Sequence, residues 1–176
     1  MTTALEQRWD KTIGIDFVQQ EDPYGDQAPY DVIADKVLAK FTDLDIKKVY
    51  HVGETVDHLN NNIEVAINGG SYRIGHGINI FQRSELLQVC INKKICFEKC
   101  PISNIFMTYC KDPRQGTSPL LQGLGIPITV NSDDPGKFGV EDGTMDYMFA
   151  FICYNWSLKN LKLLAINSIN HAICSE

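Results

Sequence analysis

The chain has 176 residues, 44% hydrophobic and 22% charged, a composition typical of soluble globular proteins, and its length predicts a single domain over residues 1–176. The formal net charge of −6 argues against binding to nucleic acid phosphates. No apolar run approaches the roughly 20 residues of a membrane-spanning helix, so a membrane partner is not expected either. The first ten residues lack the cationic start and apolar core of a signal peptide.

Short β-rich runs alternate with segments of helical periodicity along the chain. The expected strands cover residues 12–18, 48–51, 71–75, 94–98 and 126–130. The expected helices cover 31–41, 59–67, 84–91, 115–124, 145–154 and 158–172, with Ser157 as the N-cap of the last. The helix over 115–124 is the weakest of these, because glycine and proline interrupt it.

Polar, chemically capable residues end the strands at regular intervals of 25 to 35 residues: Asp16, His51, His76, Asn104 and Asp133. Consecutive βα units produce such spacing. In a parallel α/β array the carboxyl ends of the strands share one face, where sites are built. The sequence therefore predicts an α/β fold, barrel-like in architecture, with a doubly wound open sheet as the alternative.

Three of these strand ends carry groups suited to metal-assisted hydrolysis. His51 is followed by Glu54, His76 lies between glycines, and Asp133 and Asp134 are adjacent after an apolar strand. Each has a structural alternative: a hydrogen-bonded strand-end histidine, a tight turn, and an Asp-Asp-Pro turn. Together, neutral imidazole, carboxylate and a proton-carrying glutamate suit a zinc site, where the metal lowers the pKa of a bound water to about 7.

The ordered set of motifs resembles the metal-dependent adenosine deaminases, and most of all their secreted branch, the adenosine deaminase-related growth factors. The motifs that carry this resemblance are Gly14-Ile-Asp-Phe17, Gln20-Glu-Asp-Pro23, His51-Val-Gly-Glu-Thr55, Arg73-Ile-Gly-His-Gly77, Cys100-Pro-Ile-Ser-Asn104 and Ser132-Asp-Asp-Pro135. These motifs occur in the order of the family and are spread over nearly the whole chain. The resemblance implies a TIM (β/α)8 barrel, of which this chain holds about five βα units, strands 4 to 8.

The resemblance also implies an activity in purine metabolism, the zinc-dependent hydrolysis of adenosine and 2′-deoxyadenosine to the inosine form and ammonia. His51 and Asp133 are then zinc ligands, and Glu54 donates a proton to N1 of the purine. His76 orients or deprotonates the attacking water, and Asp134 bonds to the purine.

Two departures from the family pattern bear on that activity. The family carries a His-x-His pair on its first barrel strand, and no histidine precedes Thr12 here. Two expected zinc ligands therefore lie outside this chain, which is expected to begin just before the fourth strand. Gln19 replaces a glycine that lets N3 of the purine reach a backbone N–H, so its side chain is expected to crowd the base. Relatives are secreted homodimers, but their dimer elements are not evident here.

These departures leave alternative functions open. In one alternative, the chain is a truncated, catalytically inactive remnant, or a non-catalytic binding or signalling protein. A related amidohydrolase with another substrate is a third reading. Five parallel strands taken from an eight-stranded barrel would leave two open edges and an uncovered face, so the isolated chain is expected to be poorly soluble or to self-associate, and not to deaminate adenosine.

Overall fold

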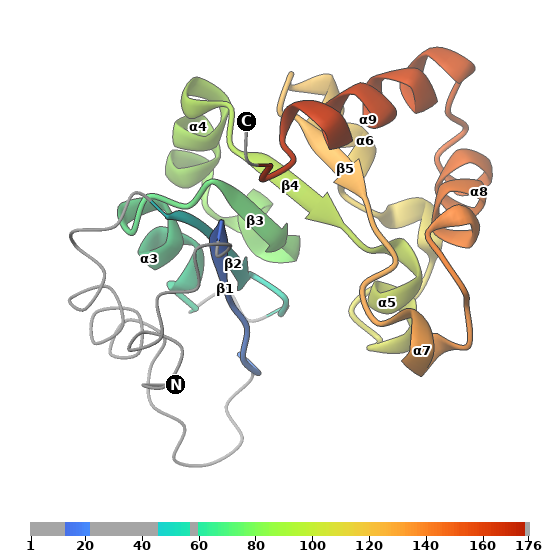
Figure 1. The fold of residues 1–176 in the computed structure, drawn as a ribbon, viewed down its shortest axis with the longest axis horizontal. Helices are drawn as coiled ribbons and strands as arrows, with labels where there is room; N and C mark the ends of the chain where they lie inside the picture. The colour runs from blue at the N-terminus through green and yellow to red at the C-terminus, as the bar shows by residue number, and fades with distance from the viewer. Residues whose placement is uncertain (1–12, 22–45, 57–59, 175–176) are drawn as a thin grey trace.

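Five parallel strands form one sheet in the computed structural model, which describes residues 13–21, 46–56 and 60–174 (Figure 1). The strands follow one another across the sheet in chain order. They are β1 (Gly14–Phe17), β2 (Lys47–Val52), β3 (Arg73–His76), β4 (Cys96–Lys99) and β5 (Ile128–Val130). All five predicted strands are confirmed, each within a few residues of its expected bounds.

The register of the sheet brings the strand ends together. Asp16 of β1 pairs with Val49, His51 pairs with Gly75, and Gly75 pairs with Glu98. Because every pairing is parallel, the carboxyl ends of all five strands lie along one edge. The residues that follow the strands are therefore neighbours in space, as their spacing predicted.

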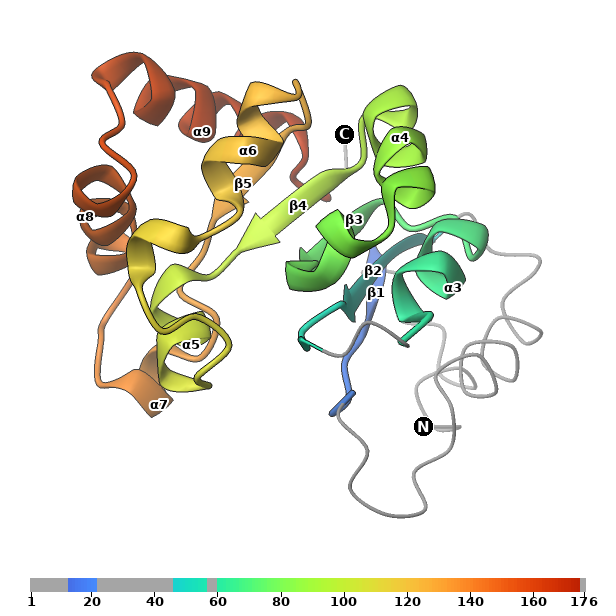
Figure 2. The same cartoon turned by 180° about the vertical axis from the view of Figure 1, so that it is seen from behind.

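Helices follow β2, β3, β4 and β5 along the chain. They are α3 (Asn62–Asn68), α4 (Ser84–Lys93), α5 (Pro101–Phe106), α6 (Ser118–Gly123), α7 (Pro135–Phe138), α8 (Thr144–Cys153) and α9 (Leu158–Asn170), with the 3₁₀ helices η1 (Ile78–Gln82) and η2 (Pro113–Gln115). Seen from behind, α3, α4 and α6 lie in front of the strands (Figure 2). None of the described helices is long and apolar enough to cross a membrane.

The predicted helices are confirmed wherever the structure describes them. The helix expected over 31–41 lies outside the described residues, and the one expected over 115–124 is shorter, beginning at Ser118. Ser157 caps α9: its extended backbone precedes the helix, and its N–H donates to Asn160 Oδ1 at 3.0 Å. The short helices α5 and α7 were not predicted. Each begins with a proline, Pro101 or Pro135. Proline favours the first position of a helix as readily as a turn, so it did not distinguish the two.

The apolar core lies between the strands and the helices that cover them. Ile74, Phe97 and Ile128 of three consecutive strands are completely buried. At the first edge, the rings of Phe17 and Tyr50 stack with centroids 4.5 Å apart. At the other, α9 packs on β5 through the fully buried Leu164. This core fixes the strands whose ends carry the polar residues.

The last two helices also carry an exposed apolar surface. Its large side chains are 36 to 76% exposed: Met145, Met148, Phe151, Ile152, Leu158, Leu163, Ile166 and Ile169. Among the described residues, β1 and β5 each pair with one neighbouring strand only. Apolar surface next to an unpaired strand edge promotes association between chains.

Candidate metal and catalytic site

His51 lies on β2 with its ring held by the neighbouring strand. Its Nδ1 is 3.0 Å from Asp16 Oδ1 on β1, and only 17% of its side chain is exposed. Burial lowers the pKa of His51, but the hydrogen bond and negative charge of Asp16 outweigh burial, so the pKa is raised overall. Metal-ligating histidines commonly bond through the second ring nitrogen to a carboxylate in this way, which fixes the ring orientation.

His76 ends β3 in a left-handed conformation, with φ of 58°. Its side chain is almost fully buried, and its Nδ1 is 3.3 Å from Asn104 Oδ1. Burial lowers the pKa of His76 to about 4, outweighing the opposite effect of Asp133, so the ring is neutral at physiological pH. The preceding Gly75 is required here, because a Cβ atom at that position would lie 2.8 Å from the His51 ring.

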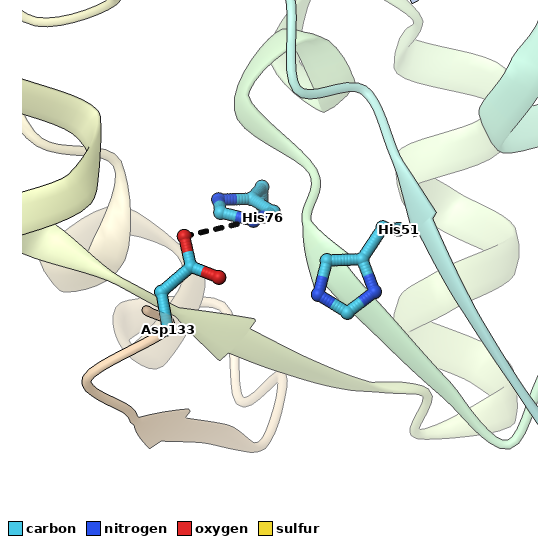
Figure 3. Close-up of side chains that lie close together, drawn as sticks. All are labelled: His51, His76 and Asp133. Carbon is cyan, nitrogen blue, oxygen red and sulfur yellow. Dashed lines mark ion pairs between the residues drawn. The ribbon is translucent and has the colours of Figure 1, made fainter. Parts of the chain in front are cut away.

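Asp133 follows β5, also with a left-handed backbone, and faces the two histidines. Its Oδ2 is 3.7 Å from His76 Nε2, and one donor atom from each of His51, His76 and Asp133 lies within 4.8 Å of the others (Figure 3). The imidazole rings lie 5.3 Å apart, tilted by 57°. Two imidazole nitrogens and a carboxylate oxygen are a donor set that can hold a transition metal ion.

Glu54 lies beside this group, whereas the Asp134 side chain is largely exposed. Glu54 Oε2 is 3.6 Å from His76 Nε2. Burial, and then the negative charge of Asp133, raise the pKa of Glu54 to about 7. A carboxyl group with that pKa can carry a proton at neutral pH. The Asp134 side chain is 57% exposed and pairs with Lys137 at 3.2 Å.

These residues line one pocket of about 580 Å³ at the carboxyl edge of the sheet. All the site residues expected from the sequence line it: Gln19, His51, Glu54, His76, Asp133 and Asp134. The sequence did not single out Glu21, Tyr109 or Phe138 for this pocket. Glu21 stood in a recognised motif, but nothing in the motif indicated its partners.

Known proteins match this chain along its length. The family model described as adenosine deaminase matches residues 2–176. "Adenosine deaminase 2" of Dictyostelium discoideum is 39% identical over 70% of this chain and 23% of its own length. "Adenosine deaminase 2" of Sus scrofa is 30% identical over 93% of this chain and 33% of its own length. The chain thus spans a third or less of these two relatives.

Solved structures show the same fold. A zinc-bound amidohydrolase from Burkholderia ambifaria superposes with a TM-score of 0.82 and 20% identity, covering 98% of this chain and 47% of its own. The five-stranded sheet and its helices therefore form part of a (β/α)8 barrel, and the open doubly wound sheet is ruled out. With a family model matched from residue 2 to residue 176, the chain belongs to the adenosine deaminase family.

Proposed function

We propose that this chain provides the groups for metal binding and proton transfer in a hydrolytic deaminase of adenosine and 2′-deoxyadenosine. The observation that carries the proposal is the convergence of His51, His76 and Asp133, from three different strand ends, within 4.8 Å. Family membership indicates the reaction, and Glu54 supplies an acid beside the same atoms. The resemblance to the secreted branch of the family favours an extracellular location.

Zinc is the metal that this donor set suits best. Nitrogen and carboxylate ligands are typical of catalytic zinc, which keeps one position open for water or substrate. The related amidohydrolase was solved with zinc bound. When bound, zinc supplies the Lewis acidity that lets water attack at neutral pH. We assign His51 and Asp133 as ligands, with two further ligands from outside this chain, and His76 as the group that faces the water.

The protein's own side chains then divide the proton transfers between them. Water adds to C6 of the purine while Glu54 donates its proton to N1, which removes the aromatic stabilisation of the ring. The neutral His76 ring orients the water and accepts its proton, which then passes to the departing N6. The bond from C6 to N6 breaks as the hydroxyl group on C6 returns its proton to Glu54 and becomes the carbonyl of inosine, and ammonia leaves. Asp134 binds the base in the same pocket, which Gln19 also lines.

Measurements of zinc affinity distinguish the two assigned ligands, His51 and Asp133, from His76, which is assigned to the water. Zinc titration of the native protein that contains this chain should show one site, which His51→Ala or Asp133→Ala weakens at least about 10-fold. His76→Ala should leave zinc affinity within a few-fold of wild type while abolishing deamination. Loss of zinc with His76→Ala would make His76 a ligand and overturn its assigned role.

The activity itself is tested on the native protein that contains this chain, loaded with zinc. Chromatography measures the conversion of adenosine to inosine. This conversion should depend on the metal and stop when a chelator removes it. Glu54→Gln should lower kcat by at least about 100-fold with zinc still bound, because general acid catalysis contributes about that much. Native zinc-loaded protein that produces no inosine would refute the proposal.

One observation favours a non-catalytic alternative. Gln19 lines the pocket at the position where the family pattern has a glycine, so this pocket has a side chain that the family pattern lacks. A protein that binds a nucleoside without deaminating it would fit that arrangement. Binding of adenosine, measured by calorimetry, without turnover would support this alternative.

A further inference from the structure

Glu21 lies in the loop after β1 and bonds to two other segments of the chain. Its Oε1 accepts a hydrogen bond from the Glu54 N–H at 2.6 Å, and its Oε2 accepts one from the Gly53 N–H at 2.9 Å. The amide groups of Asn60 and Asn62 donate to Oε2 at 3.2 and 2.7 Å. One carboxylate thus connects the end of β1, the end of β2 and the start of α3.

The four donors engage both oxygens of the Glu21 carboxylate, three at Oε2 and one at Oε1. An ionised carboxylate accepts hydrogen bonds only, and each of its oxygens offers about two lone-pair sites. Although Glu21 lines the pocket, its carboxylate is therefore bound to Gly53, Glu54 and the two asparagines of its own chain.

The segment that Glu21 holds is also fixed from the opposite side. The Gly53 carbonyl accepts a hydrogen bond from the Ile78 N–H at 2.6 Å, and the Val52 carbonyl accepts one from the Gly77 N–H at 3.0 Å. Gly53 adopts φ of +68°, and a Cβ atom there would lie 2.6 Å from Ile63 Cδ1. The carbonyl groups of residues 52 and 53 are therefore bonded to the segment after β3, and the N–H groups of residues 53 and 54 are bonded to Glu21.

We propose that Glu21 is a positioning residue, which fixes the backbone of Glu54 so that the Glu54 side chain faces His76 and the purine. This inference rests on the proposed function, because it assigns Glu54 as the acid. The reason is geometric: the Glu54 carboxyl group and the N–H group that bonds to Glu21 belong to the same residue, so a shift of this backbone also shifts the carboxyl group. A displacement of about 1 Å in a reacting group can lower the rate by about 100-fold.

The first test measures the backbone contacts in the native protein that contains this chain, without any reaction. Hydrogen exchange of the Gly53 and Glu54 amides is followed by NMR in the wild type and in Glu21→Gln. Glutamine keeps the size but retains only one acceptor oxygen and presents an NH₂ group in place of the other, so at least one of the two amides should exchange at least about 10-fold faster. The amides of β3 and β5 should not change. Unchanged exchange at Gly53 and Glu54 would overturn the proposal.

The second test uses the zinc-loaded native protein and a double-mutant cycle. Glu21→Gln should lower kcat about 100-fold with KM changed by less than about 3-fold, because the substrate contacts remain. In a Glu54→Gln background the same change should lower kcat by less than about 3-fold, because Glu21 acts through Glu54. The exposed Glu141→Gln is the matched control, with wild-type activity. Equal losses in both backgrounds would show that Glu21 acts independently of Glu54.

The two tests keep this inference separate from the proposed function. If the native protein does not deaminate adenosine, the proposed function fails, and hydrogen exchange still decides whether Glu21 fixes Glu54. If the protein is active but Glu21→Gln affects only its melting temperature, Glu21 is structural and the positioning role is refuted.

Discussion

Replacing Lys99 with methionine should stabilise the fold at neutral pH. Lys99 ends β4 with its side chain completely buried, and its Nζ donates a hydrogen bond to the His76 carbonyl. Burial lowers the pKa of Lys99 from 10.5 to about 8, so the ammonium is still charged at pH 7 inside the protein. A charge held in this environment destabilises the folded state relative to the unfolded chain.

The size of the effect follows from the shift in pKa. At about 1.4 kcal/mol per pKa unit, protonated Lys99 costs the folded state about 3 kcal/mol at pH 7. Methionine has a similar length and no charge, but it removes the hydrogen bond to His76, a loss of about 1 kcal/mol. Lys99→Met should therefore raise the free energy of unfolding by about 2 kcal/mol at neutral pH.

The pH dependence distinguishes this explanation from better packing of methionine. The folded-state pKa lies below the unfolded value, so the cost is complete below about 8 and disappears as the pH rises through 10.5. By about pH 10 the cost of the charge falls to about 1 kcal/mol, and the advantage of methionine should vanish.

Urea denaturation of wild type and Lys99→Met at both pH values measures this difference. The exposed Lys159→Met is the matched control and should change stability by less than about 0.5 kcal/mol at either pH. A Lys99→Met chain less stable than wild type at pH 7, or an advantage that persists undiminished at high pH, would refute the reasoning.

Three further predictions concern the site and the apolar surface. In the zinc-loaded protein, kcat/KM for adenosine should fall as the pH rises through about 7, because the acid Glu54 loses its proton there; a flat profile between about pH 6 and pH 8 would contradict its role. Gln19→Gly should raise kcat/KM about 10-fold in steady-state kinetics by clearing space for the purine, and no gain would show that Gln19 does not crowd the base. Ile152→Lys with Ile169→Lys, at positions 71 and 76% exposed, should reduce self-association of the isolated chain in light scattering without lowering its melting temperature. A wild-type chain that is already monomeric would contradict the last prediction.

The strands and the meeting of the site residues could be predicted because both depend on local pattern and parallel pairing. Apolar β-branched runs identify the strands, and the even spacing implies crossover connections. Parallel strands then place His51 beside Gly75, and hence beside His76, without any knowledge of side-chain contacts. The short helix α7 was missed because a proline after two aspartates is equally typical of a turn.

The contacts of Glu21 and the burial of Lys99 could not be predicted in this way. Glu21 bonds to backbone groups 32 and 33 residues away, through a loop conformation that no periodicity encodes. Lys99 follows Glu98, and two charged residues at the end of a run indicate a solvated strand end. Only the tertiary structure shows that Glu98 pairs with Arg73 at 2.5 Å whereas Lys99 is enclosed.

Backbone strain coincides with two of the residues that meet at the site. His76 and Asp133 have φ values of 58° and 59°, in the left-handed region that costs an ordinary residue about 1 to 2 kcal/mol. Lys94, Thr108 and Asn155 share this conformation, so strain alone does not identify a site. At His76 and Asp133 it occurs where the two side chains lie 3.7 Å apart, within the group that could hold a metal. Strain at residues that also meet in one pocket favours a role for their side chains in binding or chemistry.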